Sequence, residues 1–107
     1  MSVATAWLSA RRPAAPALLA GRLERALGSV SPVPERTDDL LLGAGELLLA
    51  QLLRGECATR AAAHNLLTID ALVTYAFEAA ADDPEHLEAC AQHALFRIST
   101  LAEPYEA

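Results

Sequence analysis

Prolines and glycines divide this 107-residue chain into stretches rich in alanine and leucine, and this placement of helix breakers restricts the fold most. Alanine (24) and leucine (19) supply 43 of the residues, and both are strong helix formers. No stretch alternates between apolar and polar residues as a half-buried strand would. The sequence therefore predicts an all-α fold, a small four-helix bundle-like domain with a short N-terminal arm.

Prolines and capping residues set the expected helix boundaries within a single domain over residues 1–107. Pro13, Pro16 and Pro84 suit the first turn of a helix, because proline lacks the N–H that such a turn leaves unbonded. Thr37 and Thr59 are residues of the kind that caps helix N-termini. We therefore expect an arm over 1–12, helices over 13–28, 37–54, 59–81 and 84–102, and a proline-rich linker over 29–36.

All eight basic residues are arginine, and the charges divide the chain into two parts of opposite sign. Residues 1–36 carry a net charge of +3, and residues 37–107 carry −9. An acidic body repels phosphate backbones, which argues against a nucleic-acid partner. The most apolar stretch, Leu40 to Leu53, is too short to cross a bilayer, and the N-terminus lacks a secretory signal. We therefore expect a cytoplasmic protein that binds neither nucleic acid nor a membrane.

Two of the expected helices carry more leucine than a lone four-helix domain needs. Leucines cover more than half of the circumference of helix 37–54, and helix 59–81 is apolar nearly all round. Helix 84–102 instead has a narrow apolar stripe, from which Phe96 points away. A helix apolar on most sides lies centrally or is covered by a second subunit. The pattern predicts a homodimer through a leucine-rich helix, with an interaction surface of Leu41, Leu48, Leu52, Leu67, Tyr75 and Phe96.

Asp70 is the one formally charged residue of its helix between Arg60 and Glu78. Helical spacing places it on the same side as Thr74, at the margin of the main apolar stripe. A buried carboxylate must be paired or hydrogen-bonded. We expect Asp70 and Thr74 to form a polar tie between helices or, alternatively, to contact a ligand.

Three residues of the types that bind zinc follow one face of helix 84–102. His86, Cys90 and His93 stand at positions i, i+4 and i+7, and imidazole and thiolate are zinc ligands. The three side chains extend over about 10 Å along the helix, so one ion can take two of them plus a donor from elsewhere. The sequence thus offers a zinc site as an alternative, and it indicates no other cofactor.

Two short motifs resemble those of known families. The run from His86 to His93 is similar to the His-x3-Cys-x2-Cys motif of zinc-binding anti-sigma factors, small helical domains that wrap a sigma factor. Histidine replaces the last cysteine here, which removes the thiol pair on which redox switching depends. Cys57 and His64 are similar to the Cys-x2-Cys-x3-His motif of alkylhydroperoxidase-like proteins, but Arg60 stands where the second cysteine would be, so the resolving thiol is missing.

The sequence contains no complete set of catalytic residues. It lacks the G-x-S-x-G elbow, a phosphate-cradling loop, a dinucleotide fingerprint and the Glu-x-x-His pairs of di-iron bundles. The leading hypothesis is a small helical protein–protein interaction or regulatory module, homodimeric and open to a further protein partner. The alternative is a metal- or thiol-dependent regulator or small oxidoreductase that uses the Cys and His residues of the last two helices.

Overall fold

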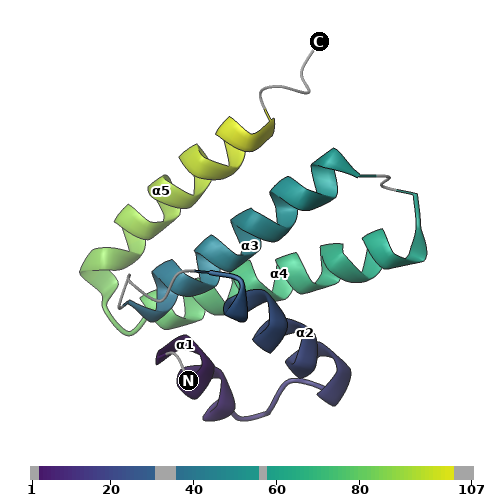
Figure 1. The fold of residues 1–107 in the computed structure, drawn as a ribbon. Helices are drawn as coiled ribbons and strands as arrows, with labels where there is room; N and C mark the ends of the chain where they lie inside the picture. The colour runs from purple at the N-terminus through teal and green to yellow at the C-terminus, as the bar shows by residue number, and fades with distance from the viewer. Residues whose placement is uncertain (1–2, 31–35, 56–57, 103–107) are drawn as a thin grey trace.

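The computed structural model describes residues 3–30, 36–55 and 58–102, and every element of regular structure within these ranges is an α-helix. α3 and α4 lie side by side and antiparallel, α1 and α2 cover one side of this pair, and α5 lies on the other side of α3 (Figure 1). The all-α class predicted from the composition is confirmed. In chain order the five helices are α1 (Val3–Ser9), α2 (Ala17–Gly28), α3 (Thr37–Arg54), α4 (Arg60–Ala80) and α5 (Pro84–Ala102).

The starts of α4 and α5 follow from local chemistry. Thr59 caps α4, because its side chain accepts a hydrogen bond of 3.0 Å from the backbone N–H of Ala62. α5 begins at Pro84, and the carbonyl of Asp83 accepts a hydrogen bond of 2.9 Å from the backbone N–H of His86. α3 and α5 span the ranges that the sequence predicts, 37–54 and 84–102, and α4 is one residue shorter at each end than 59–81.

The N-terminal part of the chain differs from the sequence prediction. The arm contains the helix α1, and α2 begins at Ala17 rather than at residue 13. The reason is steric, because a proline disfavours helical backbone at the residue before it, so Pro16 keeps Ala15 out of a helix. Pro16 itself has extended backbone, with φ −53° and ψ 146°. Most of the predicted linker over 29–36 lies outside the described residues.

The arm packs onto α4 through aromatic and ionic contacts. The rings of Trp7 and Tyr75 meet edge to face with their centroids 6.1 Å apart. The guanidinium of Arg11 lies 4.5 Å from the centre of the Trp7 ring and forms an ion pair of 3.0 Å with Glu78. Ala4 is fully buried. These contacts make α1 part of the fold rather than a free extension.

α3 is the central helix and contacts each of the other four. Leu40, Leu41 and Leu42 in its first half are at most 3% exposed. α4 passes beside Gly45, where a Cβ would make an ordinary contact of 3.5 Å with the Cβ of Leu72. The core therefore lies between the first half of α3 and the second half of α4, to which α4 contributes Leu72, Ala76 and Ala80.

α5 is attached more sparsely than the other long helices. It diverges from α4 after the turn that joins them (Figure 1). Cys90 and Ala94 are buried against the rest of the fold, and Arg97 forms an ion pair with Glu46 of α3. Leu95 and Phe96 are 71% and 70% exposed. Within the described part of the chain, no helix combines the length and the hydropathy that a membrane span requires.

Candidate functional site

The first turns of α3 and α5 meet at a polar cluster that we call the α3–α5 junction, formed by Arg36, Asp38, Asp39, His86 and Cys90. Asp38 is only 3% exposed, although it carries a carboxylate. Burial of a carboxylate is unfavourable unless the group is paired or hydrogen-bonded. The partners of Asp38 therefore define what this junction can do.

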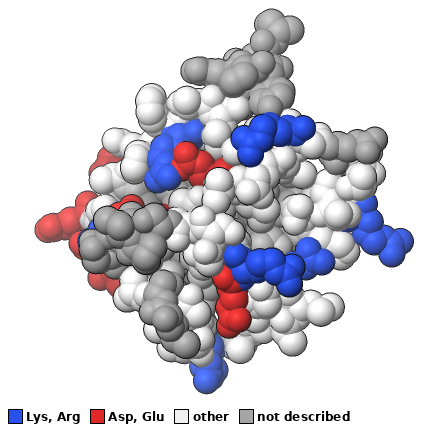
Figure 2. Space-filling view, viewed as in Figure 1, with Lys and Arg blue, Asp and Glu red and all other residues white. Residues whose placement is uncertain are grey.

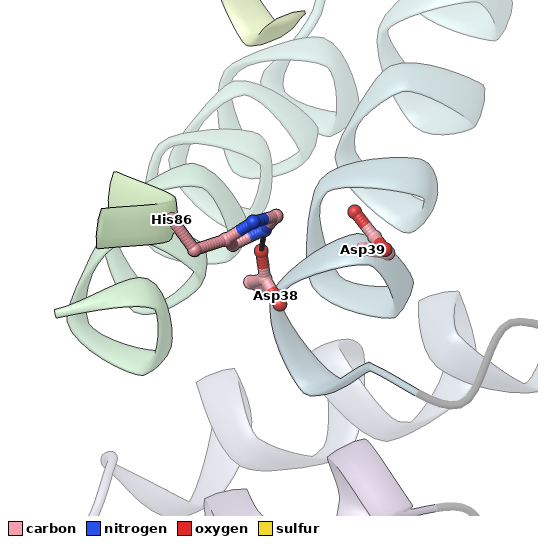
Figure 3. Close-up of side chains that lie close together, drawn as sticks. All are labelled: Asp38, Asp39 and His86. Atoms are coloured by element: carbon pink, nitrogen blue, oxygen red, sulfur yellow. Dashed lines mark hydrogen bonds and ion pairs between the residues drawn. The ribbon is translucent and has the colours of Figure 1, made fainter. Parts of the chain in front are cut away.

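Both carboxylate oxygens of Asp38 have partners from outside its own helix. Arg36, the residue before α3, donates from Nε to Oδ1 of Asp38 at 3.1 Å. His86 Nε2 lies 2.9 Å from Oδ2 of Asp38. Figure 3 shows the imidazole extending from α5 toward the start of α3, with Asp38 and Asp39 close to its ring. Both oxygens belong to the same carboxylate of Asp38, which is thereby held in one orientation. Its contact with His86 fixes the start of α5 against α3.

Cys90 lies one helical turn after His86 and adds a thiol to the junction. Its pKa is raised above the ordinary value of 9.0, first by burial, then by the negative charge of Asp38 and by a hydrogen bond to that carboxylate. The thiolate is the reactive form of cysteine, so a thiol that stays protonated at neutral pH is a poor nucleophile. Burial and the neighbouring carboxylate thus keep the Cys90 thiol in its protonated form.

Asp38, Asp39 and His86 each offer one ligand atom, and these atoms all lie within 4.8 Å of one another. No other group of three or more His, Cys, Asp or Glu side chains converges in this way among the described residues. Carboxylate and imidazole together form a donor set for divalent transition metals. The junction thus has the geometry and the ligand types of a candidate metal centre.

This group differs from the predicted zinc ligands. Of His86, Cys90 and His93, only His86 belongs to this group of converging donor atoms, and His93 is exposed on α5. His86 and His93 lie two turns apart along the axis of α5. The carboxylates of Asp38 and Asp39, in contrast, come from α3 and lie beside His86. The sequence analysis missed Asp38 and Asp39, because two aspartates at a helix start also serve the helix dipole. Their proximity in sequence was the one available signal.

Asp70 and Thr74, predicted to form a polar tie between helices or to contact a ligand, are both exposed on α4, so the expected burial of Asp70 is wrong. Asp70 lines a groove between α2 and α4 together with Leu18 and Leu67. Thr74 lines a different groove, between α4 and α5. An exposed carboxylate keeps its water and needs no partner, and the contact of these residues with a ligand stays a prediction. The buried carboxylate that links two helices is Asp38.

The predicted interaction surface is divided by the structure. Leu41 is fully buried in the core, so its assignment to a surface is wrong. The reason is that other helices of the same chain cover the first half of α3, where Leu41 lies. Leu67 is 65% exposed and Phe96 is 70% exposed. The other three predicted residues, Leu48, Leu52 and Tyr75, are half-buried.

Exposed large apolar side chains nevertheless gather on the last three helices. A groove of about 750 Å³ runs between α4 and α5 and is lined by Phe77, Leu87 and Ala91, with Glu78 and Glu88 among its polar residues. Leu95 lies one turn beyond Ala91 on the same face of α5. We call the exposed large apolar residues of these helices the open surface, which consists of Leu47, Leu66, Leu67, Leu95 and Phe96.

The two motif resemblances receive no support from the described residues. Cys57 lies outside them, and His64 is exposed on α4. The run from His86 to His93 is divided between the junction, the core and solvent. Comparisons of the chain with protein-family models, with curated proteins and with solved structures gave no match.

Proposed function

We propose that this chain is a small helical interaction module that associates with a second copy of itself through the open surface. The observation that carries the proposal is the uneven burial of α3. None of its residues from 46 to 54 is buried, although five of these nine residues are leucine. In this proposal a second copy covers the second half of α3, which α5 leaves partly exposed.

Burial of the open surface supplies a driving force for association. Leu66 and Leu95 are 55% and 71% exposed, and Leu67 is 65% exposed. Burying a leucine fully contributes about 1.5–3 kcal/mol, at about 25 cal/mol per Å² of apolar surface. Exposed leucines of this kind supply the apolar area that the core of a dimer interface needs.

The charge distribution supports self-association rather than binding of a highly charged partner. Uncharged residues cover most of the face seen in Figure 2, and arginines lie next to carboxylates at several places. Of the two glutamates at the groove between α4 and α5, Glu78 already pairs with Arg11. An apolar patch is self-complementary about a two-fold axis, whereas a patch of one charge repels its own copy. The further protein partner expected from the sequence stays a prediction.

The test is the molecular mass in solution at micromolar concentration, measured by size-exclusion chromatography with light scattering. We expect the wild-type chain to show twice its mass of 11.3 kDa. Leu66→Glu and Leu95→Glu each place a charge on the open surface, and both are expected to shift the protein to the monomer. Val3→Glu is the matched control, since Val3 is 50% exposed on α1 and lies outside the open surface.

Circular dichroism of each variant separates dissociation from unfolding, because a folded monomer keeps its helical signal. A wild-type chain that stays monomeric at micromolar concentration would contradict the proposal. The same holds if Val3→Glu dissociates the protein as strongly as Leu95→Glu does.

A further inference from the structure

We propose that the α3–α5 junction binds one divalent transition-metal ion through Asp38, Asp39 and His86. The donors come from two helices that are far apart in the sequence, and the chain fold alone brings them together (Figure 3). The proposal concerns a metal site and does not depend on self-association.

The distances already approach those of a coordinated ion. His86 Nε2 and Asp38 Oδ2 are 2.9 Å apart. Two ligands of a tetrahedral zinc ion, each about 2.0–2.1 Å from the metal, lie about 3.3 Å from each other. All three donor atoms lie within 4.8 Å of one another, so small side-chain rotations are enough to place them around one ion. Water completes the coordination.

Arg36 and Cys90 supply the outer contacts that metal ligands commonly have. Arg36 bonds Oδ1 of Asp38 and leaves Oδ2 directed at His86, where the ion would lie. Cys90, one helical turn after His86, is 5% exposed beside the same carboxylate, whose charge acts on its thiol. Such outer contacts hold a ligating carboxylate in one orientation. Asp38 is therefore already positioned before an ion binds.

The ligand types select the class of metal. Two carboxylates bring two negative charges, which exceed the single positive charge of Arg36 and the partial positive charge at the start of α3. An imidazole ligand suits zinc and its neighbours in the first transition row, whereas magnesium prefers oxygen ligands and retains its water. We therefore expect zinc to bind and magnesium to compete poorly.

The experiment is a titration of the full, untagged chain with zinc chloride in competition with a chromophoric chelator. We expect one zinc ion per chain. His86→Gln and Asp39→Asn should each weaken zinc binding by at least about tenfold, because each removes a ligand. His93→Gln and Asp70→Asn are matched controls, since each changes an exposed residue of the same type outside the junction, and both should bind zinc like the wild type.

Two further readouts keep the test decisive. Zinc should raise the melting temperature of the wild type and not that of His86→Gln, because an ion that binds only the folded chain stabilises it. Cobalt-loaded protein should lack a sulfur-to-cobalt charge-transfer band, since Cys90 is not a ligand. Asp39 is half-buried, so Asp39→Asn remains informative if His86→Gln does not fold.

Several results would overturn the metal site. They are less than one zinc ion per chain, equal affinity in Asp39→Asn and the wild type, and loss of binding in the His93→Gln control. A monomeric wild-type chain that binds zinc would overturn the proposed association and leave the metal site intact.

Discussion

The two halves of α3 are both rich in leucine but have very different surroundings. The first half places Leu40, Leu41 and Leu42 in the core, where each is at most 3% exposed. The second half, residues 46–54, contains five leucines and no buried residue. Helices of the same chain enclose the first half, whereas they leave every residue of the second half at least partly exposed.

The difference shows that leucine content indicates that a helix must be buried. It does not indicate whether the same chain or a partner buries it. The free energy gained by hydrophobic burial is proportional to the apolar area removed from water. The two halves therefore stabilise the folded chain unequally. The half that its own chain leaves uncovered is the one available to a partner. Experiments that change one half of α3 at a time test whether the two halves contribute differently to stability.

We expect the largest effect on the free energy of unfolding in a comparison of Leu41→Ala with Leu47→Ala. Leu41 is fully buried, so its truncation leaves a cavity and should lower the free energy of unfolding by about 2–5 kcal/mol. Leu47 is 37% exposed, and its truncation should cost about 1 kcal/mol or less in the monomer. Urea denaturation at low protein concentration measures both values. Equal losses in the two variants would remove the distinction between the halves.

An intermediate effect concerns the junction that anchors α5 beside the packed half. The pKa of Cys90 is raised in the folded state above its ordinary value of 9.0. As the pH rises through this value the unfolded chain loses its thiol proton first, so the unfolded state binds fewer protons and stability falls. One group changes the stability by at most about 1.4 kcal/mol per pH unit.

Urea denaturation from about pH 8 to about pH 10 checks this dependence, with the sign fixed by proton linkage. The wild-type chain should lose more stability over this interval than Cys90→Ala, while Cys57 contributes equally to both. A steeper loss in Cys90→Ala would mean that the thiol is not held in its protonated form by Asp38.

The smallest expected effect is a gain in stability from replacing a glycine near the boundary between the two halves. A Cβ at Gly45 would lie 3.5 Å from the Cβ of Leu72 and 3.6 Å from Cγ2 of Val73, which are ordinary contacts. Gly45→Ala should therefore raise the free energy of unfolding by about 0.5–1 kcal/mol through helix propensity alone. Gly43→Ala, where the nearest atom is Cγ1 of Val30 at 3.7 Å, should do the same. A loss of stability in Gly45→Ala alone would show that the contact between α3 and α4 requires glycine.

Helix positions were predictable because their signals are local. Thr59 caps α4 and Pro84 opens α5 as expected, since capping depends on a few neighbouring residues. The start of α2 was misplaced because two prolines close together compete, and only the backbone geometry at Pro16 decides between them.

The junction could not be predicted, because it depends on which helix ends meet. Asp38 and His86 are 48 residues apart, and their contact requires the tertiary arrangement of α3 and α5. The same limit explains the errors at Leu41 and Asp70. Helical spacing indicates which residues share a side of a helix, but the packing of neighbouring helices decides which side is buried.

The most direct test of the contrast is hydrogen exchange of the wild-type chain at low and high micromolar concentration, read out by mass spectrometry of peptides. We expect peptides from residues 46–54 and from the second half of α5 to exchange more slowly at the higher concentration, because a second copy covers them. Peptides from residues 38–45 should exchange at the same rate at both concentrations. Exchange that is independent of concentration throughout residues 46–54 would contradict the proposed cover by a second copy.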